Sequence, residues 1–299
     1  MRGSSMRDEM ADVTSSLQDG NDATGAIMPF APSHLAAAVG LSRQMSWPYR
    51  LQDWEFAARI GQGLALEKAG ALIGTAMWWP YGDDFASAGM IIIAKSEQGR
   101  GHGARLFDAL LAAAAPRSLM LNSTAEGLPL YQKRGFMAVG TIHQHQGVLL
   151  EQGGFAQPPD IRRGRPVDFV TIAELDCDAT GLSRPALLDH LLAAGEVVVI
   201  ERGDRLAGYA IARAFGRGQV IGPVVAENAS DARQLIKALL HKLAGAFVRL
   251  DVPAGSGLGT WLDAQGVERV GEATTMVLGH RPVAGGPLRT FAIANQSFG

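Results

Sequence analysis

Gln98-Gly99-Arg100-Gly101-His102-Gly103 is the stretch of sequence that decides the fold. It follows a short, uncharged and partly β-branched apolar run, residues 88–94, of the kind that forms a buried strand. Residues 104–115 come next and place an apolar stripe on one face of a predicted helix. A strand, a glycine-rich turn and a helix present free N–H groups and the positive end of a helix dipole to an anion. Glycine suits such a turn because a Cβ would block positive φ angles and the close approach of a phosphate. The turn is therefore predicted to bind phosphate.

Two patterns fit these residues. As Q-x-x-G-x-G (Gln98, Gly101, Gly103), the turn resembles the pyrophosphate-binding turn of the GCN5-related N-acetyltransferases (the GNAT superfamily), which hold acetyl-CoA. As G-x-G-x-x-A (Gly99, Gly101, Ala104), it fits a dinucleotide-binding turn of the Rossmann kind.

The surrounding sequence favours the acetyltransferase pattern. A Rossmann turn needs an acidic residue at the end of the next strand, whereas the predicted strand 118–122 ends in Asn-Ser-Thr. Residues 64–79 are typical of two strands around a Lys-Ala-Gly turn, so three antiparallel strands precede the glycine turn. No G-x-x-x-x-G-K-[ST] motif occurs, which excludes a P-loop.

Composition indicates a cytoplasmic protein with two domains. The chain has 299 residues and a formal net charge of −2, without a basic cluster, so neither a nucleic-acid nor a membrane partner is expected. Its single cysteine, Cys177, cannot form an intramolecular disulfide, which suits a reducing compartment. No stretch reaches the roughly 20 apolar residues of a membrane span. Residues 1–25 are polar without an apolar core and are predicted to be a disordered leader rather than a signal peptide.

The chain contains an internal repeat. Residues 65–76 and 199–210 are predicted hairpins of the same length, with a glycine at the same point of the return strand. Residues 119–136 similarly parallel residues 248–267. A spacing of about 130 residues with the same order of elements indicates a duplicated domain. We therefore predict an N-terminal acetyl-CoA-binding domain over 26–150, a linker over 151–165 and a C-terminal domain over 166–299.

The two copies differ at the turn. The second copy has Ala-Glu-Asn-Ala-Ser-Asp at 226–231, without glycine. Glu227 and Asp231 would repel a phosphate, and Asn228, Ser230 or Asp231 can cap the helix from within the chain. The C-terminal domain is therefore predicted to be degenerate and to bind no cofactor.

The whole arrangement resembles the tandem acetyltransferases of the GNAT superfamily, over roughly residues 26–299. Besides the glycine turn, the resemblance rests on Ser46-Trp47-Pro48, on Asp53-Trp54, and on Leu130-Tyr131 followed by Gly135-Phe136. It implies an α/β (α+β) fold of two domains, each a mixed, mostly antiparallel twisted sheet flanked by helices. It also implies an acyl-CoA-dependent N-acyltransferase, with acetyl-CoA as the cosubstrate.

The resemblance assigns roles to individual residues. Backbone N–H groups of Ile91, Ile92 and Ile93 would polarise the thioester carbonyl. The pyrophosphate would be held by Gln98, Gly99, Arg100, Gly101, His102 and Gly103, with Ala104 and Arg105 opening the helix. Asn122 would bind the pantetheine arm or an ordered water. Tyr131 would act as general acid, because a phenol with a pKa near 10 can donate to a thiolate whose thiol pKa is near 8.5. Leu262 stands at the position aligned with Tyr131 in the second copy.

Several residues keep two interpretations. The general base is open among Glu126, Asp83 and Asp84. His143 and His145 share one strand face but lack a third ligand, so no metal site is predicted. The aromatic residues Trp47, Tyr49 and Trp54 form either an acceptor wall or core anchors. Arg184 could bind a carboxylate of the acceptor, but it is expected to be a surface arginine at a helix start.

The predicted function is transfer of an acetyl group from acetyl-CoA to a primary amine of a small molecule, or of a peptide, by direct attack. The first alternative is a non-catalytic acyl-CoA-binding sensor on the same fold. The second is an NAD(P)-dependent oxidoreductase that uses the dinucleotide pattern. The identity of the acceptor and the formation of a homodimer stay open.

Overall fold

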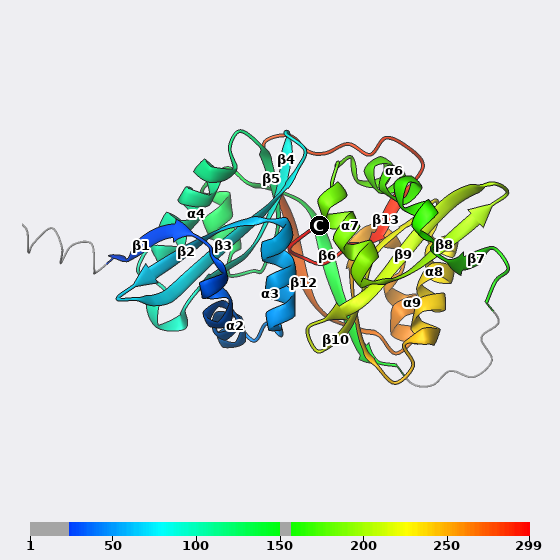
Figure 1. The fold of residues 1–299 in the computed structure, drawn as a ribbon, viewed down its shortest axis with the longest axis horizontal. Coiled ribbons are helices and arrows are strands. Elements are labelled where there is room, and N and C mark those ends of the chain that lie inside the picture. The colour runs from blue at the N-terminus through cyan, green and yellow to red at the C-terminus, as the bar shows by residue number, and fades with distance from the viewer. Residues whose placement is uncertain (1–23, 150–156) are drawn as a thin grey trace, which may run out of the picture.

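The β-strands of both repeats form one continuous twisted sheet (Figure 1). The computed structural model describes residues 24–149 and 157–299. Within these residues the sheet has 13 strands, in the order β1-β2-β3-β4-β5-β12-β6-β11-β10-β9-β8-β7, and β13 pairs with β10. The strands of the N-terminal half are β1 (Ala26–Pro29), β2 (Gln62–Lys68), β3 (Ala71–Tyr81), β4 (Phe85–Ile93), β5 (Ser118–Ser123) and β6 (Met137–Val148). Those of the C-terminal half are β7 (Ile161–Arg163), β8 (Glu196–Arg202), β9 (Arg205–Phe215), β10 (Gly218–Ala226), β11 (Phe247–Pro253), β12 (Glu268–Leu278) and β13 (Arg289–Ala292).

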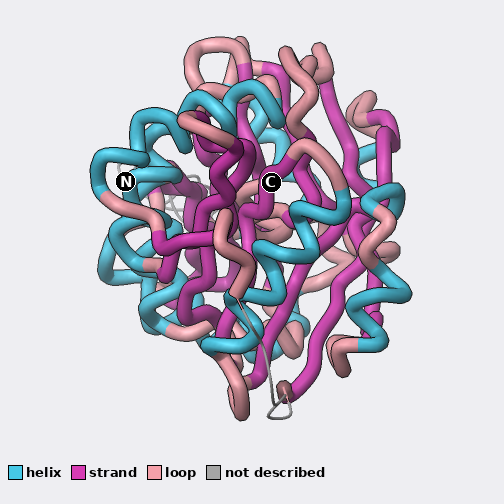
Figure 2. The backbone as a smooth tube through the Cα atoms, turned by 90° about the vertical axis from the view of Figure 1, so that its right-hand side faces the viewer, coloured by secondary structure: helices cyan, strands magenta, loops and turns pink. Residues whose placement is uncertain are grey.

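Helices cover the sheet, as the view onto the C-terminal half shows (Figure 2). The α-helices are α2 (Leu35–Gln44), α3 (Leu51–Ile60), α4 (His102–Ala114), α5 (Leu128–Gln132), α6 (Phe169–Thr180), α7 (Pro185–Ala194), α8 (Ala229–Lys242) and α9 (Gly259–Ala264). No helix in the described part of the chain is long and apolar enough to span a membrane.

The predicted hairpins and the predicted repeat are confirmed. β2 and β3 are joined by Ala69 and Gly70, which both have positive φ (49° and 74°), as a two-residue hairpin turn between right-twisted strands requires. The order β2-β3-β4-α4-β5-α5-β6 recurs as β8-β9-β10-α8-β11-α9-β12. The fold is therefore the predicted mixed α/β arrangement of two copies.

The two halves exchange their long last strands. β12 pairs antiparallel with β5, from Thr274 opposite Ser123 to Leu278 opposite Leu119. β6 in turn pairs antiparallel with β11, from Phe247 opposite Val148 to Pro253 opposite Ile142. β12 and β6 also pair with each other at the centre of the sheet (Figure 1). Each half therefore completes the sheet of the other.

The domain boundaries proposed from the sequence stay a prediction. β7 lies within the stretch predicted as a linker, 151–165, and pairs with β8. Of the predicted leader, only Thr24 and Gly25 belong to the described residues.

The apolar core is shared between the halves because β9 presents two different faces. Tyr209 and Ile211 belong to the cluster that contains Trp54 and Trp79 of the N-terminal half. Their neighbour Ala210 instead belongs to a second cluster, beneath α8. Since side chains alternate along a strand, one strand can connect the two cores.

The exchanged strand β6 provides a test of this packing. A Cβ added at Gly147 would lie 1.9 Å from the Gly266 carbonyl oxygen, whereas one at Gly140 would lie 3.9 Å from its nearest neighbour, Thr275 Cβ. We expect Gly147→Ala to lower the free energy of unfolding by about 1–3 kcal/mol through overpacking. Gly140→Ala is the matched control and should change it far less. Urea unfolding of both variants measures the difference, and equal values would contradict this view of the crossing.

Candidate active site

The glycine turn has the backbone that the sequence predicts. After a 3₁₀ turn at Lys95–Glu97, Gly99 and Gly101 adopt φ angles of +75° and +83°, and α4 begins at His102. No atom lies within 4 Å of a Cβ placed on either glycine, so the space above the turn is open in the described part of the chain. Gln98 Nε2 donates to the Ile93 carbonyl oxygen at 3.0 Å, which ties the turn to the end of β4. Gly99 and Gly101 are exposed, and no backbone hydrogen bond within the described residues uses their N–H groups, so these amides are available to an anion.

Charged side chains around the turn are partly engaged with the chain itself. Glu97 Oε2 lies 3.2 Å from Lys68 Nζ, 3.3 Å from His102 Nε2 and 3.5 Å from Arg100 Nη1. The hydrogen bond from Lys68 is the main cause that lowers the pKa of the Glu97 carboxyl. Arg105 donates to the carbonyl oxygens of Thr24 and Gly25. Arg100 keeps a largely exposed guanidinium, with 59% of its side chain accessible. Their predicted contacts with a pyrophosphate stay predictions.

β4 and β5 separate just before the turn. They pair in parallel only at Phe85, Ala86 and Ser87, and no other described strand takes the free edge of β4 beyond them. The pairing of β4 with β3 shifts register in the same stretch, where Met90 has a φ of +51° and its carbonyl oxygen accepts from Thr75 Oγ1 at 2.8 Å. Such a bulge bends its strand. Residues 91–93 therefore lie on a strand edge that opens away from its neighbour.

Tyr131 lies beside the end of β5 with a free hydroxyl. Its ring packs edge-on against Phe107, 4.9 Å between centroids, and a Cβ on Gly127 would approach both its ring and Ser123 Oγ to 2.9 Å. No hydrogen bond joins its hydroxyl to another described residue. Burial raises its pKa to about 12, so the phenol stays protonated at neutral pH. Gly135, three residues beyond the end of α5, has a φ of +84°.

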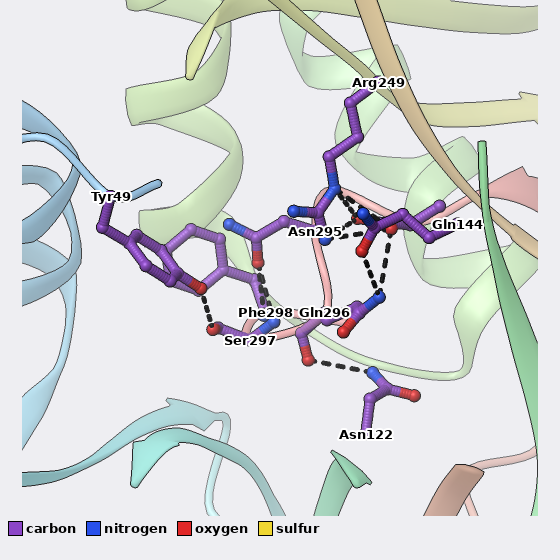
Figure 3. A network of polar contacts seen from close by, with 9 residues as sticks. Tyr49, Asn122, Gln144, Arg249, Asn295, Gln296, Ser297 and Phe298 are labelled. Atoms are coloured by element: carbon purple, nitrogen blue, oxygen red, sulfur yellow. Dashed lines mark hydrogen bonds and ion pairs between the residues drawn. The ribbon is translucent and has the colours of Figure 1, made fainter. Parts of the chain in front are cut away.

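The C-terminal segment, residues 293–299, lies against the opening, which the sequence did not predict. Asn122 Nδ2 donates to the Gln296 carbonyl oxygen at 2.9 Å (Figure 3). Asn122 Oδ1 accepts from Thr275 Oγ1 at 2.7 Å. Ser297 is so close to β4 that a Cβ on Gly89 would lie 3.0 Å from Ser297 Cβ. Asn122 thus holds strand β12 and the C-terminal segment, and its predicted role in binding acetyl-CoA stays a prediction.

The predicted aromatic residues divide between core and wall. Trp54 is fully buried, stacks on Phe30 and donates from Nε1 to Ser42 Oγ at 2.9 Å, so it is a core anchor. Tyr49 is partly exposed, and its hydroxyl lies 3.0 Å from Ser297 Oγ (Figure 3). Trp47 meets the Tyr49 ring at its edge. Tyr49 therefore borders the C-terminal segment, and Trp47 packs against Tyr49.

The corresponding opening in the C-terminal half is filled by the chain. β10 pairs with β11 only at Gln219 and Val220, and further along β13 takes its place, pairing at Val224, Val225 and Ala226. The helix that follows is capped by Asn228, whose Oδ1 accepts from the Asp231 N–H at 3.0 Å. A β-strand and the Asn228 side-chain amide thus occupy the corresponding places in the second half, which supports the prediction of a degenerate second copy.

The remaining candidates are the three carboxylates considered as general base and the histidines of β6. Asp83, Asp84 and Glu126 are exposed, and backbone hydrogen bonding lowers the pKa of Glu126, which weakens it as a base. His145 is buried with Nδ1 3.0 Å from the Val267 carbonyl oxygen. Among residues 24–149 and 157–299, no cluster of three His, Cys, Asp or Glu side chains could hold a metal ion.

The expectation that Arg184 is a surface residue is wrong. Its side chain is buried, and Nε and Nη2 bind the two carboxylate oxygens of Asp176 at 2.7 and 2.9 Å. Asp176 also accepts from the Tyr209 hydroxyl. A helix-start position predicted exposure, but α6 and α7 pack on each other and bury both charges as a pair.

Comparison with known proteins agrees with this geometry. Models of the acetyltransferase (GNAT) domain match residues 50–151 and, separately, 172–289. The chain belongs to the GNAT superfamily, as a tandem-domain member. Both GNAT domains contain the repeated elements described above, so the resemblance found in the sequence is confirmed.

Individual relatives cover most of the chain. The uncharacterised N-acetyltransferase YitH of Bacillus subtilis is 25% identical over 238 residues, 78% of this chain and 84% of the relative. The holothin acyltransferase of a Pseudoalteromonas species is 28% identical over 207 residues, 68% of this chain and 69% of the relative. A candidate acetyltransferase from Pyrococcus horikoshii has a similar fold, with a TM-score of 0.76 at 17% identity over 92% of this chain and 95% of that one. A tandem GNAT protein of the clavulanic acid pathway gives a TM-score of 0.59 at 15% identity, over 85% and 98%.

The Tyr131 environment predicts an alkaline titration. We expect the difference in phenolate absorbance between the wild type and Tyr131→Phe to show an apparent pKa near 12, two units above that of a free phenol. Because the folded state holds this proton more tightly than the unfolded chain, its contribution to stability is complete below pH 10 and is lost as the pH rises toward 12. A difference titration centred near pH 10 would contradict the burial.

Proposed function

We propose that this GNAT protein transfers the acetyl group of acetyl-CoA to a primary amine of a small molecule or peptide by direct attack. One observation supports this most: β4 separates from β5 after Ser87 and continues to a turn in which Gly99 and Gly101 are exposed and their N–H groups make no backbone hydrogen bond within the described residues. This combination suits a ligand with a thin arm and a pyrophosphate. The N-terminal domain has it, whereas in the C-terminal domain β13 fills the corresponding opening.

The residues of the turn fit a pyrophosphate. Positive φ at Gly99 and Gly101 exposes successive N–H groups, and the start of α4 adds its dipole. Arg100 is the accessible guanidinium beside them. These groups would hold the pyrophosphate of acetyl-CoA, while its pantetheine arm would enter between β4 and β5.

Bound acetyl-CoA would supply an acetyl thioester, with the thiol as leaving group. The N–H groups among Ile91, Ile92 and Ile93 that face the free edge of β4 would donate to the acetyl oxygen as negative charge develops there. Tyr131 would donate from its free hydroxyl to the departing sulfur. With a pKa of about 12 it remains a neutral donor across the neutral range, which suits hydrogen-bond donation.

The names of two relatives agree with acyl transfer to nitrogen or to a small molecule: one is called an N-acetyltransferase and the other a holothin acyltransferase. The competing function is a sensor that binds acyl-CoA without turning it over. The free hydroxyl of Tyr131 favours catalysis, because a binding protein has no use for an unpaired donor at this place.

Calorimetric titration tests the binding step. We expect acetyl-CoA to bind once per chain, since β13 fills the second opening, and NADH to give no heat under the same conditions. Two molecules per chain would contradict a degenerate C-terminal domain. NADH binding without acetyl-CoA binding would favour the oxidoreductase and overturn the proposal.

A tyrosine substitution tests catalysis. We expect Tyr131→Phe to lower kcat by about a hundredfold, the lower range for loss of a positioned acid, with the acetyl-CoA Kd within about twofold. Tyr209→Phe is the matched control, since its hydroxyl binds Asp176 in the C-terminal half, and it should affect stability instead. Unchanged turnover in Tyr131→Phe would remove Tyr131 from the mechanism. A wild type that binds acetyl-CoA yet acetylates none of a broad panel of amines would favour the sensor.

A further inference from the structure

Arg213 is a buried cation that forms no ion pair with any residue the structure describes. It lies near the end of β9, with only 4% of the residue exposed. Within the described residues, neither Nε nor Nη2 has a hydrogen-bond partner, and Nη1 has only a long contact, 3.4 Å, to the Ala214 carbonyl oxygen. Leaving a buried charged group unpaired is unfavourable, so such a group calls for a ligand.

Neighbouring charges do not neutralise it. Asp53 is the acid with the strongest effect on Arg213, but its carboxylate already binds Arg50, at 2.7 and 3.0 Å, and the Gly216 N–H. Arg249 is paired with Asp251 at 2.8 Å. Asp53 and Asp251 are therefore each paired with another arginine, and neither forms an ion pair with Arg213.

Two aromatic rings lie against the guanidinium of Arg213. Its Cζ lies over the Phe56 ring of α3, 4.9 Å from the ring centroid, and over the Phe215 ring at 5.1 Å. The rings interact with the cation but accept none of its N–H bonds, which all lie in the plane of the group. Nε and Nη2 are neighbours along one edge, and together they match the two oxygens of a carboxylate.

The protein uses the same edge elsewhere for carboxylates. Through Nε and Nη2, Arg50 binds Asp53, Arg134 binds Asp108, and Arg184 binds Asp176. Arg249 binds Asp251 in the same way. Arg213 offers the same pair of donors with no carboxylate opposite them.

Contacts connect Arg213 to the opening in the N-terminal domain. The Phe215 ring meets the Tyr49 ring edge-on at 5.3 Å, and the Tyr49 hydroxyl lies 3.0 Å from Ser297 Oγ. Ser297 in turn lies against Gly89 on the free edge of β4. Through Phe215, Arg213 is therefore connected to Tyr49 and to the C-terminal segment.

We propose that Nε and Nη2 of Arg213 bind a carboxylate of the acceptor, so that the acceptor is an amine that also carries a carboxylate. This inference rests on the proposed acetyltransferase function. Because Phe215, Tyr49 and Ser297 lie between the guanidinium and β4, the amine and the carboxylate are separated by several bonds, as in an ω-amino acid, in lysine or in a short peptide. Entry of the carboxylate requires these side chains to move apart.

The first experiment compares carboxylates with carboxamides. Glycine, β-alanine, aminohexanoate and lysine are each assayed beside the matching carboxamide, with wild type, Arg213→Met and Arg213→Lys. We expect the wild type to favour the carboxylate in the longer compounds by at least about tenfold in kcat/KM, and both variants to lose that preference. The acetyl-CoA Kd should stay unchanged in both. Arg217→Met, an exposed arginine over Phe247 on the same hairpin, is the control and should keep the preference.

The second experiment needs no turnover. Sodium acetate, compared with sodium chloride at equal ionic strength, should raise the Tm of the wild type by about one degree or more and leave Arg213→Met unchanged. Equal protection of both proteins, or of neither, would overturn the inference, as would equal rates with carboxylates and carboxamides. Either result leaves acetyl-CoA binding intact, so failure of this inference is distinct from failure of the proposed function.

Discussion

The exchange of β6 and β12 is the constraint on which the rest of the structure depends. Because β12 is inserted between β5 and β6, neither half has a complete sheet of its own, and the two cores meet across β9. The chain that leaves β12 must then return across the second half as β13 before it reaches the first. One topological choice therefore closes the opening of the C-terminal domain and borders the opening of the N-terminal domain with residues 293–299.

The same repeat thus produces two unequal domains. In the first domain β4 separates from its parallel neighbour β5, and in the second β10 separates from β11. A helix follows β4 and β10 in each case. In the first domain positive-φ glycines leave that space open, whereas in the second β13 and the Asn228 cap satisfy the same backbone groups from within the chain. Backbone groups that the chain itself does not satisfy must be satisfied by water or by a ligand, and the exposed Gly99 and Gly101 leave room for either in the first domain.

Local signals in the sequence were sufficient for the elements and the glycine turn. Gly99 and Gly101 indicated their conformation because few other residues tolerate positive φ, and the hairpins followed from short-range turn chemistry. The strand exchange, the position of residues 293–299 and the burial of Arg184 depend on pairing between distant segments, which no local pattern encodes. Asn122 illustrates this limit, since its partners Thr275 and Gln296 are more than 150 residues away.

The burial of Arg213 could be predicted from the sequence, but the residues around it could not. Tyr209, Ile211 and Phe215 alternate along β9, and the period of two places Arg213 on their buried face. A buried arginine needs a carboxylate from another segment of the chain to neutralise it. The buried Arg184 has such a partner in Asp176 on the preceding helix. Near Arg213, by contrast, Asp53 already forms an ion pair with Arg50, and Asp251 forms one with Arg249. A methionine would fill this position between Phe56 and Phe215 without an unpaired charge, so a purely structural role does not account for an arginine there. Recognition of an anion does account for it, and the shared core places that anion where both domains contribute to the acceptor side.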